Sequence, residues 1–239
     1  MKESAFYDKE KAQKREDFFR DNTQTPTDMN DFFFRLIYDG TSAGAKILDI
    51  GTGNAFILEQ LALRYPSRYS LYGVDISPEM LKKAKKRTSG LDIQLVLGDN
   101  MDLPFRSGFF DAITAKNVTN FSESEVYRVL NTHGKFFFRE YGSGKGLREI
   151  AEIFKGRLIR SRSADFYIQG LKSAGFKNIT LNELNIQREY SFEELLQVIQ
   201  LFPFLDYIGE KERTEIRSYF EGKKKVPITS DQIVIMGEK

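Results

Sequence analysis

A glycine-rich turn preceded by an acidic residue is the part of this sequence with the clearest capacity for chemistry. Residues 49–53 read Asp-Ile-Gly-Thr-Gly and follow the apolar pair Ile47 and Leu48. After the glycines the apolar residues take helical spacing, which predicts a buried strand, a tight turn and a helix over 54–64. Such a turn presents backbone N–H groups beside a helix N-terminus. Anionic or strongly polar groups bind at this kind of site.

A second carboxylate stands at a distance from the turn that suits nucleoside binding. Asp75 comes 22 residues after Gly53, at the end of a second apolar run over 69–74. A carboxylate there can accept hydrogen bonds from both hydroxyls of a ribose. A dinucleotide site would also require a third glycine, and Phe56 occupies that place. A nicotinamide-dependent oxidoreductase therefore remains an alternative that lacks one of its glycines.

A third carboxylate follows the next apolar run. The strand expected over 93–97 ends in Gly98-Asp99-Asn100-Met101, and a further strand opens with the aromatic-acid pair Phe110-Asp111. By itself Asp99 is typical of a turn or a helix cap. Its position behind Asp49 and Asp75 favours a role in ligand binding instead.

These motifs, in this order and at these intervals, resemble class I S-adenosylmethionine-dependent methyltransferases of the small-molecule, methyltransferase domain 11/25-like kind. The resemblance covers residues 44–140 by motif and extends more loosely to 239 by strand order. It implies the cofactor S-adenosyl-L-methionine, with S-adenosyl-L-homocysteine as product. The residues that it places at the cofactor are Asp49, Gly51, Thr52, Gly53, Asp75, Ile76, Asp99, Asn100, Met101 and Lys116.

The resemblance also implies a division of labour among these residues. The turn 51–53 would contact the methionine portion, and Asp49 would order its amino group directly or through water. Asp75 would take the ribose, and Ile76 would pack on the adenine. Asp99 would accept a hydrogen bond from the adenine amino group, and Asn100 and Met101 would line the adenine ring. Lys116 lies where contacts to the methionine end and to the acceptor meet.

No catalytic residue can be identified from the sequence. A sulfonium methyl is already activated for in-line displacement, so positioning the acceptor and excluding water can supply much of the rate. If the acceptor must lose a proton, Glu140, Tyr141 or Lys116 could assist. The only histidine, His133, stands in a turn before a strand, and we expect no catalytic role for it.

Composition limits the other possibilities. The chain has 239 residues, no cysteine and a net charge of +2, so it can bury one substantial core but offers neither thiolate nor multi-histidine metal sites. We expect no metal, no signal peptide, no membrane span and a cytoplasmic protein. The charge balance argues against a nucleic-acid partner. The sequence leaves open a monomer or a homodimer.

The expected fold is α/β: a Rossmann-like, seven-stranded, mostly parallel sheet with one antiparallel strand, helices on both faces and a helical cap insertion. We expect a single methyltransferase domain over 1–239, consisting of an N-terminal helical lid (1–45), a cofactor-binding core (46–183), a helical insertion or cap (184–229) and a final strand (230–239). Tyr7 and Phe19 are candidate lid residues. The aromatic-rich ends of the chain favour a small, partly apolar acceptor.

Two alternatives keep the same core. Basic clusters at 82–87, 155–162 and 223–225 would suit an RNA methyltransferase, although the first is typical of the solvated face of an amphipathic helix. A non-catalytic protein that binds S-adenosylmethionine also fits, because no catalytic residue stands out.

Overall fold

The computed structural model describes residues 27–118, 120–159, 161–201, 204–205 and 207–239, so the candidate lid residues Tyr7 and Phe19 lie outside it. The chain divides into two compact units. The larger contains Asp28–Glu140, Ala164–Asn182 and Ile233–Lys239. Of the described residues, the smaller contains Thr27, Tyr141–Ser163 and Glu183–Gln232. The proposal of a single domain over the whole chain stays a prediction.

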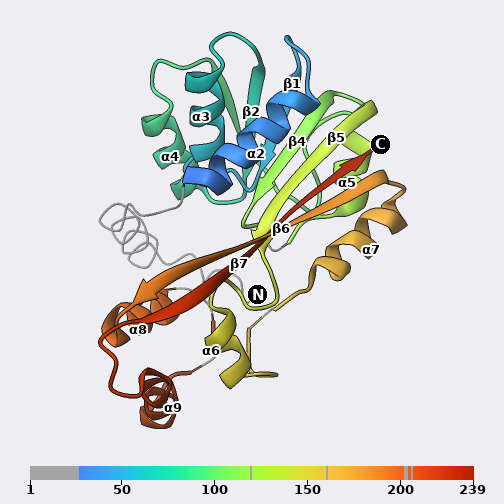
Figure 1. Cartoon of the computed structure of the whole chain (residues 1–239). Coiled ribbons are helices and arrows are strands. Elements are labelled where there is room, and N and C mark those ends of the chain that lie inside the picture. Colours follow the sequence, from blue (N-terminus) through green and yellow to red (C-terminus); the bar gives the residue numbers. More distant parts are fainter. Residues whose placement is uncertain (1–26, 119, 160, 202–203, 206) are drawn as a thin grey trace. The chain divides into compact units, whose positions relative to one another are not determined.

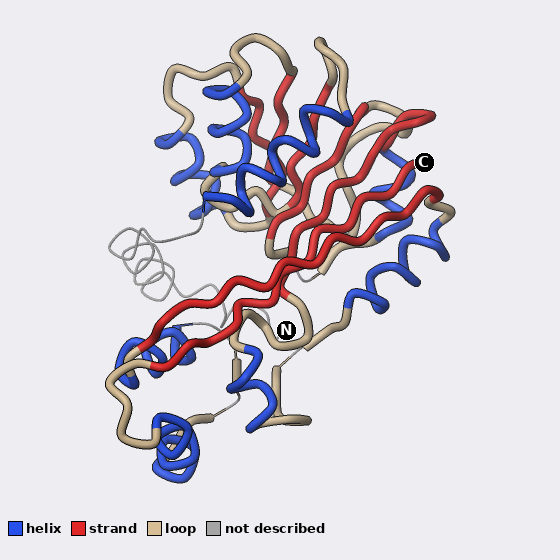
Figure 2. Tube along the Cα trace, viewed as in Figure 1, coloured by secondary structure: helices blue, strands red, loops and turns tan. Residues whose placement is uncertain are grey.

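The described strands form a seven-stranded sheet in the order β3-β2-β1-β4-β5-β7-β6 (Figure 2). Hydrogen-bonded neighbours from β3 through β5 are all parallel. β6 and β7 point in opposite directions (Figure 1). This confirms the predicted fold class. The strands are β1 (Lys46–Ile50), β2 (Ser70–Asp75), β3 (Ile93–Leu97), β4 (Phe110–Lys116), β5 (Leu130–Tyr141), β6 (Lys177–Tyr190) and β7 (Val226–Glu238).

Helices cover both faces of the sheet in the larger unit. On β5, Phe136 and Phe138 join the hydrophobic cluster that contains residues of α5 and α7. Phe137, which alternation turns to the other face, lies against Gly40 at the end of α2. The helices of this unit are α2 (Thr27–Gly40), α3 (Phe56–Arg64), α4 (Pro78–Arg87), α5 (Glu123–Val129) and α7 (Ala164–Ala174).

The segments Ser77-Pro78-Glu79 and Ser122-Glu123-Ser124-Glu125 each predict the start of a helix, and helices of the larger unit begin at both. The Ser77 hydroxyl accepts the Met80 N–H at 3.3 Å, with Pro78 in the first turn of α4. The Ser122 hydroxyl accepts the Glu125 N–H at 3.2 Å at the start of α5. Both caps satisfy N–H groups that the first helical turn leaves without partners.

Apart from its share of β5, β6 and β7, the regular elements of the smaller unit are helices joined by loops. It contains α6 (Arg148–Ile153), α8 (Phe192–Leu201) and α9 (Glu210–Phe220). Its own hydrophobic cluster includes Phe154, Leu195 and Phe220. The insertion predicted over 184–229 therefore contains two helices, but its two ends belong to β6 and β7. Its role as a cap stays a prediction. No helix in the described part of the chain combines the length and the apolar character that crossing a membrane requires.

Several elements differ in length from those expected. The sequence pattern predicts strands over 176–184 and 230–239 and a helix over 147–160. In the structure β6 continues to Tyr190 and β7 begins at Val226, so both strands extend beyond the predicted ranges, whereas the helix ends at Ile153. From Leu184 to Tyr190 exposure alternates residue by residue, which is the pattern of a strand with one half-buried face.

The glycines at 142, 144 and 146 indicate a flexible loop, but in the structure the loop is held by one carboxylate. Asp231 Oδ2 accepts the Gly144 N–H and Asp231 Oδ1 accepts the Gly146 N–H, both at 2.8 Å. Asp231 is only 6% exposed, so little water competes for these bonds. The sequence could not reveal them because the partners stand 87 and 85 residues apart.

Asp231→Ala should therefore lower the melting temperature. Two buried N–H groups would lose a charged acceptor, which costs about 2 kcal/mol, or about 4 to 8 °C for a chain of this size. Differential scanning fluorimetry measures the shift. Glu152→Ala, which removes an exposed acid of the same unit, is the control. Equal melting temperatures for the two variants would contradict the role of Asp231.

Candidate functional site

The predicted site residues meet at one edge of the larger unit's sheet. β3, β2, β1 and β4 are parallel neighbours, so their carboxyl ends share this edge. The residues predicted at the cofactor stand on the last residues of these strands or on the loops directly after them. Open α/β sheets bind ligands at such an edge. We call it the carboxyl edge.

Asp75 fixes the shape of the glycine turn. Its Oδ2 accepts the Gly53 N–H at 2.8 Å and its Oδ1 accepts the Ser77 N–H at 2.9 Å. The carboxylate is 8% exposed. The Thr52 N–H is bonded to the Val74 carbonyl at 3.0 Å, which ties the turn to the end of β2. Asp75 thus organises the turn as well as standing at the place predicted for a ribose.

Gly51 occupies a position that admits no side chain. Its φ is +58°, in the left-handed region, and a Cβ would lie 2.8 Å from Val118 Cγ2. The Gly51 N–H donates to Asn100 Oδ1 at 3.1 Å, so Asn100 joins the turn to the loop after β3. Val118, which closes over the turn, was not predicted. It follows β4, and only the folded sheet brings it to Gly51.

Asp49 is buried on the sheet with a partner from the neighbouring strand. It is 2% exposed, and the Thr114 hydroxyl donates to its Oδ1 at 2.7 Å. Burial raises the pKa of Asp49 to about 6, an effect that the Thr114 hydrogen bond partly offsets. The Thr52 hydroxyl is also buried and lies close enough to Asp49 to lower the pKa of that carboxyl, but it makes no hydrogen bond of ordinary geometry within the described part of the chain. A bound polar group could supply such a bond.

Lys116 lies at the end of β4 among charged groups of both signs. Its ammonium is 4.9 Å from the centre of the Phe56 ring. Burial first, and then the nearby Arg139 guanidinium, lower the pKa of Lys116 to about 8, although Asp49 and Glu140 partly oppose the shift. Arg139 is the register partner of Lys116 on β5 and donates to Asn30 Oδ1 of α2. Neither Arg139 nor Asn30 was predicted, because cross-strand register joins them to the site.

Exposed apolar side chains gather around the ends of β2 and β3. Ile76 is 61% exposed, Leu97 58% and Met101 54%. Large side chains of this kind, beside backbone N–H groups and carboxylates, suit a flat aromatic ring joined to a polar tail. Asp99 is exposed as well, and its Oδ1 accepts the Met101 N–H at 2.9 Å. The turn predicted for Asp99 alone is therefore present, beside the exposed surface predicted for adenine.

Glu140, a candidate for proton transfer, and the histidine His133 both stand on β5. Glu140 is 8% exposed near the end of β5, on the face opposite Arg139 by strand alternation. His133 lies within β5 and not in a turn before the strand, at a point where the register with β4 is interrupted. It has a φ of +67°, and its side chain is 82% exposed, 3.6 Å from Glu238 Oε1. The roles suggested for Glu140, Tyr141 and Lys116 stay predictions.

Taken together, the carboxyl edge fits S-adenosylmethionine. A turn closed to side chains presents N–H groups, two buried carboxylates flank it, and apolar surface lies exposed near the third acid. The buried Thr52 hydroxyl adds an oxygen that makes no hydrogen bond of ordinary geometry within the described part of the chain. When bound, this cofactor supplies an electrophilic sulfonium methyl group.

Comparisons with known proteins point to the same family. Residues 47–134 match the model of a methyltransferase domain. The chain is 30% identical over 190 residues to the ubiquinone/menaquinone biosynthesis C-methyltransferase UbiE of Rickettsia akari. The matched region covers 74% of this chain and 68% of that protein. It is 36% identical over 107 residues to malonyl-[acyl-carrier protein] O-methyltransferase of Legionella pneumophila, covering 42% of this chain and 37% of that protein.

A solved structure shares the fold. The putative methyltransferase of Bacillus halodurans superimposes with a TM-score of 0.63 at 15% identity, over 87% of this chain and 98% of that one. At this identity the likeness concerns the fold alone. The match to the Rickettsia akari protein and the methyltransferase domain model carry the family assignment. The chain belongs to the class I S-adenosylmethionine-dependent methyltransferase family.

Proposed function

We propose that this chain transfers the methyl group of S-adenosylmethionine to a small-molecule acceptor. The observation that carries the proposal is the turn around Gly51 and Gly53, held by Asp75 and adjoining the exposed apolar side chains Ile76 and Met101. This arrangement can hold the amino-acid tail, the ribose and the adenine of the cofactor in one orientation. Positioning the acceptor in line with the methyl group then supplies much of the rate.

Each site residue has a proposed part in that orientation. The N–H groups and the hydroxyl of the turn 51–53 bind the methionine portion, and Asp49 draws its ammonium group toward the end of β1. Asp75 accepts the ribose hydroxyls. Asp99 accepts a hydrogen bond from the adenine amino group, and Asn100 and Met101 lie along the adenine ring. Lys116, beside Phe56, stands between the methionine end and the acceptor.

The names of the relatives support a small-molecule acceptor. One of them methylates a malonyl group on an acyl carrier protein, and another acts in ubiquinone and menaquinone biosynthesis. The chain spans only 37% of the first of these, so its own acceptor does not follow from the name. A cytoplasmic location and a monomeric or dimeric state likewise remain proposals.

Removing residues 190–222 and finding unchanged turnover would reject the proposed cap.

Calorimetric titration with S-adenosylhomocysteine tests cofactor binding directly. We expect heat of interaction at one site per chain, and none with NADH. Transfer of a tritiated methyl group from S-adenosylmethionine into separated small-molecule and RNA fractions then tests the acceptor class. Label in the RNA fraction would favour the RNA methyltransferase. A folded protein that binds no S-adenosylhomocysteine would refute the proposal.

The oxidoreductase alternative would be favoured by a catalytic Tyr-x-x-x-Lys pair. Tyr141 and Lys145 have this spacing in the sequence. On a helix this spacing would put both side chains on one face. Here Tyr141 ends β5 and Lys145 lies in a turn with a φ of +52°. The Lys145 ammonium donates to the Ile159 carbonyl. This geometry does not favour the hydride-transfer alternative.

The raised pKa of Asp49 leads to a pH-dependent affinity. The cofactor ammonium binds the ionised carboxylate, and in the folded, ligand-free chain that form is lost as the pH falls through about 6. The affinity for S-adenosylhomocysteine should therefore drop about tenfold between pH 7.5 and pH 5. Calorimetry across this range measures it. Asp49→Asn, which cannot ionise, should bind more weakly at pH 7.5 and lose this dependence. A wild-type profile as flat as that of the variant would contradict the assignment.

A further inference from the structure

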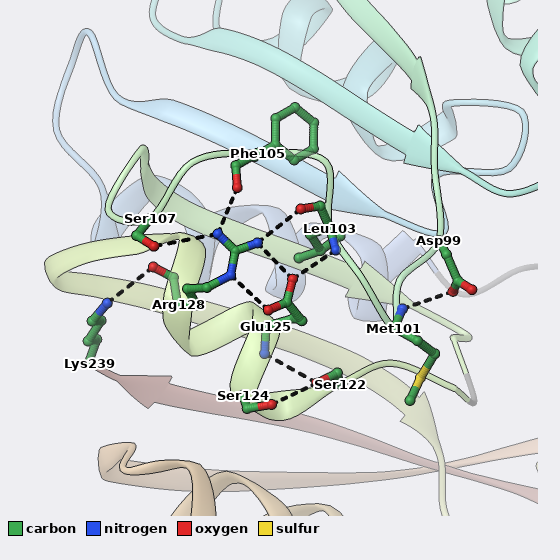
Figure 3. A network of polar contacts seen from close by, with 10 residues as sticks. All are labelled: Asp99, Met101, Leu103, Phe105, Ser107, Ser122, Ser124, Glu125, Arg128 and Lys239. Carbon is green, nitrogen blue, oxygen red and sulfur yellow. Dashed lines mark hydrogen bonds and ion pairs between the residues drawn. The ribbon is translucent and has the colours of Figure 1, made fainter.

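A single arginine of α5 holds the loop that carries Asp99 and Met101. Arg128 Nη1 donates to the Phe105 carbonyl at 2.8 Å, and Nη2 donates to the Leu103 carbonyl at 2.9 Å (Figure 3). We call residues 99–105 the adenine loop, from their proposed role. The rigid fork of the guanidinium suits two carbonyls at a fixed separation. Arg128 thereby sets the spacing of the loop's second half.

Glu125 locks this arginine in place and also binds the loop itself. Its two carboxylate oxygens each accept a bond of 2.7 Å from Arg128, one from Nε and one from Nη2 (Figure 3). Glu125 Oε2 also accepts the Leu103 N–H at 2.9 Å. The Arg128 hydrogen bond is the main cause that keeps the pKa of Glu125 below its usual range. The bonds from Arg128 thus favour the ionised carboxylate, which also accepts the Leu103 N–H.

The first half of the adenine loop is attached to the same helix and to the glycine turn. The Ser122 N–H, at the start of α5, donates to the Asn100 carbonyl at 3.1 Å. Asn100 Oδ1 accepts the Gly51 N–H. Hydrogen bonds thus attach both halves of the adenine loop to α5 and attach its Asn100 to Gly51. Asp99 and Met101 lie within the segment that these contacts fix.

We propose that Glu125 and Arg128 are positioning residues that determine how selectively the site recognises adenine. The inference rests on the proposed function, since it takes Asp99 and Met101 as the adenine contacts. Without the guanidinium the Phe105 carbonyl loses the Arg128 donor and the Leu103 carbonyl keeps only the Phe105 N–H, so the loop can shift. A hydrogen bond to the adenine amino group tolerates little displacement, whereas the amino-acid tail is held by the glycine turn.

Three ligands separate this role from a general loss of structure. S-adenosylhomocysteine carries both adenine and tail, S-inosylhomocysteine replaces the amino group by an oxygen, and 5′-methylthioadenosine lacks the tail. We expect the wild type to prefer S-adenosylhomocysteine over the inosyl analogue by about tenfold, as for one hydrogen bond to a charged group. In Arg128→Lys and Glu125→Gln this preference should fall to within about twofold. The ratio of affinities for S-adenosylhomocysteine and 5′-methylthioadenosine should not change.

Arg64→Ala provides the matched control. Arg64 also pairs with a carboxylate of the larger unit, Asp31, at 2.8 Å, and no described contact joins it to the adenine loop. It should leave all three affinities as in the wild type. Calorimetry gives the dissociation constants, and thermal melting confirms that each variant is folded.

Each outcome decides between two explanations. If the folded variants keep the wild-type preference, or if both ratios change together, the pair has no specific role in adenine recognition. If Arg128→Lys and Glu125→Gln both fail to fold, the pair is structural and the inference is overturned. If the wild type binds S-adenosylhomocysteine but shows no preference for adenine, only this inference fails. If it binds none of the ligands, the proposed function fails with it.

Discussion

Gly51→Ala is expected to weaken binding of S-adenosylhomocysteine about 100-fold, or about 2.7 kcal/mol. A side chain at a φ of +58° costs about 1 kcal/mol or more in backbone strain. In addition its Cβ would lie 2.8 Å from Val118 Cγ2 and 3.2 Å from Asn100 Nδ2. One of these neighbours must move, and Asn100 is the residue that accepts the Gly51 N–H. The turn would lose the shape that presents its N–H groups. Calorimetric titration measures the loss.

Gly90→Ala separates backbone strain from the close approach. Gly90 has a φ of +83°, and nothing lies within 4 Å of a Cβ built there. The substitution should lower stability by about 1 kcal/mol but leave the affinity for S-adenosylhomocysteine unchanged. Val118→Ala in the Gly51→Ala chain should restore part of the affinity by making room. Wild-type affinity in Gly51→Ala would show that the turn does not contact the cofactor.

Asp75→Ala is expected to weaken S-adenosylhomocysteine binding by about 1 to 3 kcal/mol, from the loss of charge-assisted hydrogen bonds. The structure gives the carboxylate two tasks. It accepts the N–H groups of Gly53 and Ser77, and it stands where the ribose hydroxyls are expected. Asn at this position is not a neutral replacement, because its amide nitrogen would face one of those N–H donors. The affinity should therefore fall in Asp75→Asn as well.

Ligands distinguish the two tasks of Asp75. If it binds the ribose, the loss should be as large for 5′-methylthioadenosine as for S-adenosylhomocysteine. If it acts only by shaping the turn, the tail-bearing ligand alone should weaken. Glu79→Ala, which removes an exposed acid four residues away, is the control for net charge. Undiminished affinity of Asp75→Ala for both ligands would contradict the ribose assignment.

The carboxyl edge of the larger unit's sheet was largely predictable because its signals are local. A short apolar run followed by glycines predicts a strand and a turn, whatever the rest of the chain does. Asp49, Asp75 and Asp99 could be placed at or just after strand ends for this reason, and parallel strands bring those ends to one edge. The serine caps at Ser77 and Ser122 were equally local, since each hydroxyl bonds an N–H three residues ahead.

Strand lengths in the second half of the chain were harder to predict. The alternation from Leu184 to Tyr190 is present in the sequence, yet a helical insertion was expected to begin at 184. β6 and β7 are neighbours in the sheet, so each extends as far as its partner does. Pairing over such a separation depends on register, which short sequence patterns do not specify.

The sequence by itself determined the family, the order of the strands along the chain and the position of the glycine turn, because these depend on residues close together in the chain. Only the tertiary structure decided which distant residues meet. Thr114 donates a hydrogen bond to Asp49 across 65 residues, and Arg139 donates one to Asn30 across 109. It also decided that Arg128 holds the adenine loop and that Asp231 holds residues 144 and 146. The physical reason is that such contacts form through sheet register and helix packing, where the strength of each bond depends on burial that no local pattern records.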